Sequence, residues 1–114
     1  MENLKKVVKI LDDKHAADIV VLDMKNYSPI YDYMIITTAK NDRLAAGIVK
    51  EIKDVAEELG LNLKRVEGTQ HYQWVLADLS QIVIHVFTEE TRLEYNLEKL
   101  WRDVPRVDAE ELLK

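Results

Sequence analysis

The hydrophobic positions of this chain alternate between helical and strand-like spacing. Near the N-terminus, four apolar residues recur at intervals of three and four positions, which predicts an amphipathic helix. They are Leu4, Val7, Val8 and Leu11. The segments DIVVLDM (18–24) and YMIITTA (33–39) are short runs rich in β-branched residues and predict strands. Because residues 33–39 are almost continuously apolar, we expect that strand to be covered on both faces and to lie centrally in a sheet.

The longest helix is predicted over residues 42–59, where apolar side chains again follow helical spacing. Its apolar face comprises Leu44, Ile48, Ile52, Val55 and Leu59, with Ala45, Val49 and Ala56 beside them. Asn41 or Asp42 is suited to cap the first turn, and Gly60 stands where a left-handed residue would end the helix. The charged residues on the other side of the helix are expected to face solvent.

Further elements are predicted in the second half of the chain. Residues 63–68 indicate a short peripheral strand, residues 74–87 two strands, and residues 88–101 a helix that Pro105 prevents from continuing far. One stripe of that helix is expected to hold Leu93, Leu97, Leu100 and Trp101. This order predicts an α/β fold in a single domain, with a mixed sheet of about five strands and packed helices.

The domain is expected to cover residues 1–102, followed by a short C-terminal tail over residues 103–114. Asp108 and Glu111 in the tail have the spacing of a helix capping box. Because the segment is short and terminal, we expect no more than a frayed helical turn there.

The stretch WVLADLSQIVIHVF (74–87) places a tryptophan and a histidine in apolar surroundings. A tight turn centred on Leu79 and Ser80 would place Trp74 opposite His85. By strand alternation, one face of this hairpin holds Trp74, Leu76, Val83, His85 and Phe87, and the other holds Val75, Ala77, Ile82, Ile84 and Val86. The aliphatic face is expected in the core. The first face has two interpretations: either a helix covers it and His85 is a hydrogen-bonded core histidine, or it is a partly exposed binding surface.

Composition narrows the classes of function. Net charge is −5 and the basic residues are dispersed, which disfavours direct nucleic-acid binding and favours a partner with a basic surface. No apolar run is long enough to span a bilayer, and the N-terminus lacks the pattern of a signal peptide. The absence of cysteine excludes disulfides and thiol chemistry and fits a cytoplasmic location.

Catalytic and cofactor motifs are not found. The spacing of His15, His71 and His85 matches no zinc motif, and the three glycines form no phosphate-binding loop. Neither serine stands in a nucleophile elbow. We therefore expect no cofactor and no metal.

Five segments, in order along the chain, resemble the ribosomal silencing factor family, also called Iojap-like. These segments are DIVVLDM, YDYMIITTA, VEG, WVLADLSQIVIHVF and TRLEYNLEKLW. The resemblance implies a fold like that of nucleotidyltransferases without their catalytic residues. It also implies a function in which the protein binds a basic ribosomal protein on the intersubunit face of the large ribosomal subunit. Bound there, it would block association with the small subunit and repress translation under nutrient limitation.

The resemblance also implies which residues bind the partner. The tryptophan and tyrosine of the family's ribosome-facing patch correspond to Trp74 and Tyr95. Further motif positions assigned to the same patch are Leu76, Asp78, His85 and Leu97. Two alternatives are weighed against this function. One is a nucleotidyltransferase-like enzyme with a degenerate metal site built from Asp32, Asp78 or Glu67, and the other is a homodimer that buries the aromatic face.

Overall fold

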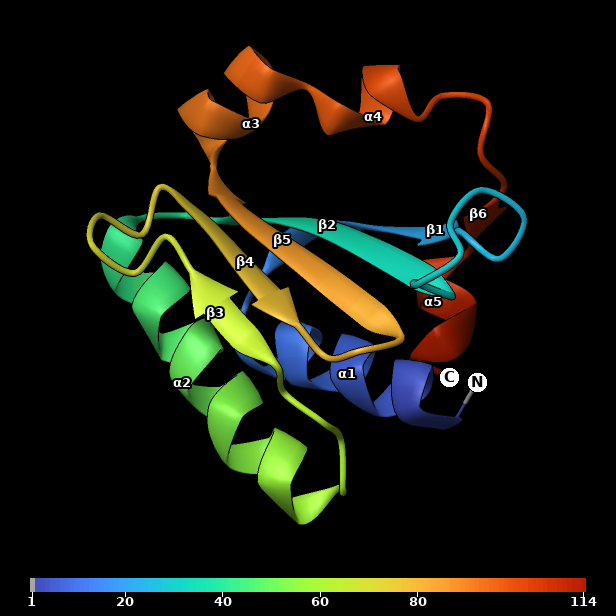
Figure 1. Cartoon of the computed structure of the whole chain (residues 1–114). Coiled ribbons are helices and arrows are strands. Elements are labelled where there is room, and N and C mark those ends of the chain that lie inside the picture. Colours follow the sequence, from blue (N-terminus) through green and yellow to red (C-terminus); the bar gives the residue numbers. More distant parts are fainter. Residues whose placement is uncertain (1) are drawn as a thin grey trace.

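A six-stranded mixed β-sheet forms the centre of the computed structural model, which describes residues 2–114 (Figure 1). The strands are β1 (Ala17–Asp23), β2 (Tyr33–Ala39), β3 (Arg65–Glu67), β4 (Trp74–Asp78), β5 (Ile82–Thr88) and β6 (Arg106–Val107). They lie in the order β3-β4-β5-β2-β1-β6. The β2–β5 pair is parallel and the other neighbours are antiparallel. The predicted α/β fold with a mixed sheet is confirmed, with one strand more than expected; its likeness to nucleotidyltransferases stays a prediction.

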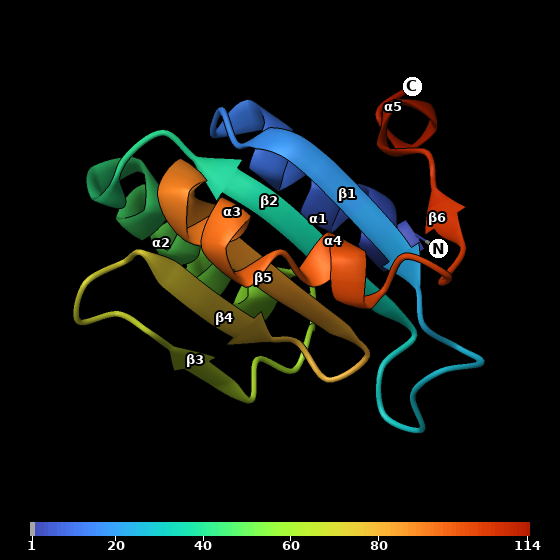
Figure 2. The same ribbon diagram turned by 90° about the horizontal axis from the view of Figure 1, so that it is seen from above.

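Helices cover both faces of the sheet, so the fold has three layers. They are α1 (Glu2–Asp13), α2 (Asp42–Glu58), α3 (Glu89–Tyr95), α4 (Leu97–Leu100) and α5 (Ala109–Leu112). Figure 2 shows α3 and α4 on the near face of the sheet, with α1 and α2 behind it. Two apolar cores result, one under α1 and α2 and one under α3 and α4. None of the helices within residues 2–114 is long and apolar enough to cross a membrane.

The local predictions for the central strand and the long helix are confirmed. All seven residues of β2 are buried, and β2 lies between β5 and β1 inside the sheet. The Asn41 carboxamide caps α2 by accepting a hydrogen bond from the Leu44 amide at 2.8 Å. At the other end, Gly60 has φ +69°, the left-handed conformation that glycine adopts without a steric penalty.

The β4–β5 hairpin turns one residue later than predicted. Trp74 faces Phe87, and Leu76 faces His85, because the Leu79 amide donates to the Ile82 carbonyl at 2.8 Å and Ser80 adopts a left-handed φ of 73°. The cross-strand register therefore differs from the prediction by two residues. A shift of two leaves every side chain on its predicted face, since strand faces alternate with a period of two. The aliphatic face lies in the core under α1 and α2, as predicted.

The prediction of a single helix over residues 88–101 is wrong, since the structure has two helices there, α3 and α4. Asn96 has φ 43° and ψ 59°, a left-handed conformation that separates α3 from α4. Asparagine tolerates this conformation, and its side chain caps α4 by accepting from the Lys99 amide at 3.3 Å. The break also divides the predicted stripe. Leu97 and Trp101 pack towards the sheet, whereas two leucines face solvent; these are Leu93 and Leu100.

Residues after 103 add to the sheet and to both cores. Arg106 and Val107 form β6 beside β1, and Val104 is buried in the core under α3 and α4. Leu112 is buried in the other core, where α5 packs against α1. Asp108 caps α5 by accepting from the Glu110 amide at 3.0 Å. The domain boundary expected after residue 102 stays a prediction; in the structure the last segment packs against the rest of the fold.

Candidate functional site

An aromatic cluster joins the β4–β5 hairpin to α3. Trp74 lies at its centre, with ring centroids 4.4 Å from Tyr95, 5.0 Å from Phe87 and 6.0 Å from His85. These separations fall in the range in which aromatic rings attract one another beyond the effect of area burial. The cluster thus fixes Tyr95, at the last turn of α3, to the face of the sheet.

Exposure increases from the sheet outwards through this cluster. Phe87 is fully buried, Trp74 is half-buried, and Tyr95 is 52% exposed. The half-exposed ring is therefore held in place by the ring beneath it. A rigid, partly exposed aromatic residue loses little conformational entropy when a partner covers it.

His85 is the buried end of the cluster. Its Nδ1 accepts a hydrogen bond from the Trp74 indole N–H at 3.0 Å, and only 7% of the residue is exposed. Burial lowers the pKa of His85 from 6.5 to about 4. The ring is therefore neutral at pH 7, consistent with Nδ1 as an acceptor. His85 therefore fits the first interpretation of this face, a hydrogen-bonded core histidine. Tyr95, at the outer part of the same face, is exposed to solvent.

The remaining predicted site residues separate into two groups. Leu76 and Leu97 are half-buried and pack in the same apolar core as Trp74. Asp78 is buried at the opposite end of β4, where its carboxylate accepts from the Tyr31 hydroxyl and from the Ser80 amide, each at 2.9 Å. The structure thus brings five of the six residues together, and Asp78 supports the hairpin turn instead.

Two exposed leucines extend the apolar surface around Tyr95. Leu93 on α3 is 75% exposed and Leu100 on α4 is 70% exposed. Together with Tyr95 they line a shallow hollow of about 670 Å³, whose charged lining includes Lys99 and Asp103. We call Leu93, Tyr95 and Leu100, with Trp74 beneath them, the α3–α4 patch. Large apolar side chains grouped on a surface and surrounded by polar residues are typical of a protein-binding site.

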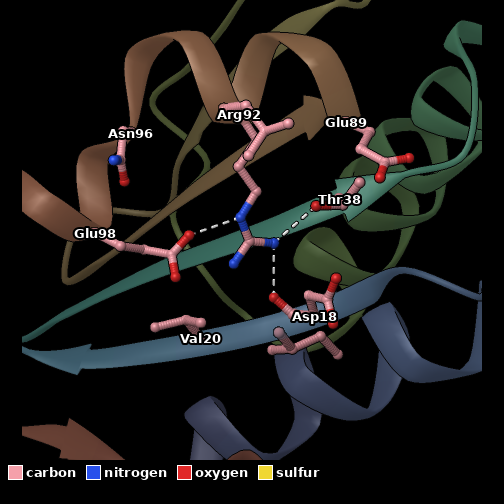
Figure 3. Close-up of a pocket in the computed structure, with 9 residues that line it drawn as sticks. Asp18, Val20, Thr38, Glu89, Arg92, Asn96 and Glu98 are labelled. Atoms are coloured by element: carbon pink, nitrogen blue, oxygen red, sulfur yellow. Dashed lines mark hydrogen bonds and ion pairs between the residues drawn. The ribbon is translucent and has the colours of Figure 1, made fainter.

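Arg92 fastens the α3–α4 segment to the sheet (Figure 3). Its Nε donates to the Glu98 carboxylate at 2.8 Å, and its Nη1 donates to the Asp18 carbonyl at 2.8 Å and the Thr38 hydroxyl at 2.7 Å. One side chain thereby connects α3 with α4, β1 and β2. The arginine side chain is only 12% exposed, and hydrogen bonds to charged groups are stronger than those between neutral groups.

A second hollow, of about 510 Å³, lies beside this network. Among the described residues that line it are three carboxylates, from Asp18, Glu89 and Glu98, and one cation, Arg92. Arg92 pairs with Glu98, so the carboxylates of Asp18 and Glu89 leave an excess of negative charge. Leu93 connects this hollow to the α3–α4 patch, since it lines both hollows. The patch is therefore bordered by negative charge, which would favour a basic partner.

The carboxylates of the alternative metal site belong to no larger cluster of ligands among the described residues. Within residues 2–114, no three His, Asp or Glu side chains are grouped as metal ligands. Asp78 is instead occupied by Tyr31, Ser80 and, at 3.7 Å, Arg65. Glu67 lies on the edge strand β3 with an exposed side chain.

Comparison with known families decides the class of protein. The family model described as "Ribosomal silencing factor during starvation" matches residues 1–114. The chain belongs to the ribosomal silencing factor family. This confirms the resemblance in the five sequence segments. It is a family of regulatory factors and not of enzymes, so the nucleotidyltransferase-like alternative is not retained.

Individual relatives agree with the membership. The ribosomal silencing factor of Bacillus subtilis is 44% identical over 112 residues, covering 95% of each chain. That of Halalkalibacterium halodurans is 43% identical over 109 residues, covering 96% of this chain and 93% of the relative. A crystal structure of a Bacillus halodurans protein superposes with a TM-score of 0.83 at 41% identity, covering 94% of this chain and 97% of that one.

Sequence patterns did not indicate that Arg92 and Glu98 form an ion pair. The two residues are six positions apart, a spacing that would place them on different sides of one continuous helix. The left-handed Asn96 between them turns the chain so that their side chains meet. A polar residue that tolerates left-handed backbone, within an otherwise helical pattern, was the available signal.

Proposed function

We propose that this ribosomal silencing factor docks through its α3–α4 patch on a basic ribosomal protein at the intersubunit face of the large subunit. The bound domain then occupies space that the small subunit needs, and translation is repressed under nutrient limitation. The mechanism is steric and requires no cofactor. With this role we expect the protein in the cytoplasm, as for a factor that acts on ribosomal subunits there.

The observation that carries this proposal is the contact between half-exposed Tyr95 and Trp74, whose ring centroids lie 4.4 Å apart with the rings tilted by 46°. Trp and Tyr are enriched among the residues that dominate binding energy at interfaces. Leu76 and Leu97 support the pair from below, and His85 holds the indole in place. In this proposal Tyr95 and Trp74 contact the partner, whereas His85 and Asp78 act by keeping the hairpin rigid.

Charge around the patch agrees with a basic partner. Residues 89–103 contain five carboxylates, from Glu89, Glu90, Glu94, Glu98 and Asp103, against three cations, from Arg92, Lys99 and Arg102. Complementary charge at the rim of an interface accelerates encounter more than it increases affinity. We therefore expect raised salt to slow association and to change dissociation less.

Sedimentation with isolated large subunits tests the proposal. Tyr95→Ala should weaken co-sedimentation by at least about thirtyfold in affinity, the effect of losing about 2 kcal/mol at an interface hot spot. The same variant should no longer prevent subunits from joining in a gradient. Ile30→Ala removes an exposed apolar side chain from the β1–β2 loop and serves as the matched control. Undiminished binding of Tyr95→Ala would refute the role of the patch.

The same apolar surface also suits a second copy of the chain. A twofold dimer would bury Leu93, Tyr95 and Leu100 against their own equivalents and would compete with the ribosome for the patch. Light scattering over a range of concentrations distinguishes the two uses. A dimer formed through this surface dissociates when Tyr95 is changed to Ala, whereas a mass that stays monomeric at all concentrations excludes it.

A further inference from the structure

A groove on the other side of the molecule joins an apolar floor to a basic rim. It lies among α1, the C-terminal end of α2 and the end of α5 with the residues that follow it, and has a volume of about 590 Å³. Its floor is formed by Ile10, Val55, Leu59, Leu112 and Leu113, and its rim by Lys5, Lys6, Lys9 and Lys114. The volume lies within the range of about 300–1,000 Å³ common for ligand sites.

The charge of this groove is opposite to that of the whole protein. Four lysine side chains line it and, among the residues that the structure describes, no Asp or Glu side chain does, although the chain carries a net charge of −5. Lys5 and Lys6 form no ion pair within the described chain, residues 2–114. Lys9 pairs with Asp13 at 3.4 Å and Lys114 with Glu111 at 3.0 Å, but both pairs are exposed. Exposed pairs contribute little stability, so all four ammonium groups are available to an anionic ligand.

The arrangement of the lining residues fits a helix. Lys5 and Lys9 are one turn apart on α1, and Val55 lies one turn before Leu59, the C-cap residue of α2. Each pair follows its helix axis, so basic and apolar rows line the groove between the helices. We propose that this groove binds an acidic amphipathic helix of a partner protein. The apolar stripe of that helix would pack on the floor, and its flanking Asp and Glu side chains would meet the lysines.

Nucleic acid and membrane surfaces fit the groove less well. RNA is bound through phosphates and stacked bases, whereas the described residues of the floor here are all aliphatic. A flat anionic bilayer would also meet the acidic remainder of this protein. A short acidic helix interacts only with the local basic rim and avoids that repulsion.

The groove and the α3–α4 patch lie on opposite faces of the sheet. In Figure 1, α1 and α2 lie on one side of the strands, and α3 and α4 lie on the other. Occupancy of one surface therefore leaves the other free. The inference extends beyond the proposed function: a silencing factor docked through its patch would still present the groove to a second protein.

Designed peptides test the groove with purified full-length protein and without ribosomes. The probe is a labelled helical peptide of about 18 residues, with leucine at positions i, i+3, i+4 and i+7 and glutamate at the flanking positions. One comparison peptide has lysine in place of glutamate, and another has the same composition without the stripe. We expect binding of the acidic peptide alone. Amide NMR shifts should move at Lys5, Ile10 and Leu59 and stay unchanged at Tyr95.

Charge reversal supplies the matched variants. Lys5→Glu with Lys9→Glu should lower the affinity for the acidic peptide about tenfold or more, because attraction at the rim becomes repulsion. Lys53→Glu, on the exposed side of α2, should leave the affinity for the acidic peptide unchanged. Tyr95→Ala should bind this peptide as the unmodified chain does. Circular dichroism should confirm that the variants fold, since all three lysines are exposed.

Several results would overturn the proposal. They are no binding of the acidic peptide, equal binding of the lysine peptide, and binding that the double reversal leaves unchanged. Vesicles containing anionic phospholipid and a single-stranded RNA are tested in parallel. Binding to either one that is lost only in the double reversal, without peptide binding, would assign the groove to that ligand instead. Failure here leaves the sedimentation result with Tyr95→Ala unaffected, so the two proposals fail separately.

Discussion

The indole N–H of Trp74 donates a hydrogen bond to Nδ1 of His85 over 3.0 Å, diagonally across the β4–β5 hairpin. This bond requires a neutral histidine, because an imidazolium ring has no acceptor. It also sets the orientation of the indole against which the Tyr95 ring packs. The protonation state of one buried ring is thereby linked to the geometry of the proposed docking surface.

Acid should destabilise the protein through His85. The folded pKa of about 4 lies below the ordinary value of 6.5, so the unfolded chain binds the proton more readily between those pH values. The stabilisation is complete above pH 6.5 and is lost as the pH falls, by at most about 1.4 kcal/mol per pH unit, down to about pH 4. Urea unfolding of the unmodified chain and of His85→Gln across this window measures the difference. A parallel decline in both proteins would contradict the prediction.

Trp74→Phe should separate the hydrogen bond from the stacking. Phenylalanine keeps an aromatic ring against Phe87 and Tyr95 but cannot donate to His85, so we expect a loss of about 1 kcal/mol in the free energy of unfolding. Trp74→Ala also removes the packing and should cost about 2–4 kcal/mol, somewhat less than for a fully buried tryptophan. Equilibrium urea unfolding compares the two. Equal losses would show that stacking contributes nothing.

Arg92→Ala should loosen α3 and α4. The change leaves Glu98 and the Thr38 hydroxyl without their strongest partner, and we expect a loss of about 2–4 kcal/mol. Hydrogen exchange should rise in residues 89–101 before it rises in the sheet. Arg102→Ala, at an exposed arginine of the same segment, is the control and should change stability by less than about 0.5 kcal/mol. Unchanged exchange in Arg92→Ala would exclude a fastening role.

Asn96 should accept glycine but not alanine. At φ 43° a side chain with a Cβ and no local hydrogen bond is strained by about 1–2 kcal/mol, whereas glycine is not. Asn96→Ala should therefore lower the melting temperature by several degrees, and Asn96→Gly by less. Alanine also favours one continuous helix, which would move Leu97 off the sheet and weaken binding to large subunits. Equal melting temperatures for the two variants would contradict this account.

Local patterns in the sequence determined much of this fold. The apolar spacing of α1 and α2, the Asn41 cap and the Gly60 terminus depend on residues within a few positions of one another, so they could be read directly. The two faces of the hairpin were also assigned correctly in spite of a wrong register, because an error of two residues leaves the alternation intact. Family membership could also be predicted from local sequence, because five short segments carry the resemblance.

Tertiary structure alone decided how the candidate site is built. His85 is buried against Trp74 while Tyr95 stays exposed, and Arg92 is joined to Asp18 and Thr38. These arrangements depend on contacts between residues far apart in the chain. The same is true of β6, a strand of two residues whose only evidence is its pairing with β1. Helical periodicity over residues 88–101 predicted one continuous helix. The chain instead breaks at Asn96, because packing Leu97 and Trp101 on the sheet offsets the strain of one left-handed residue.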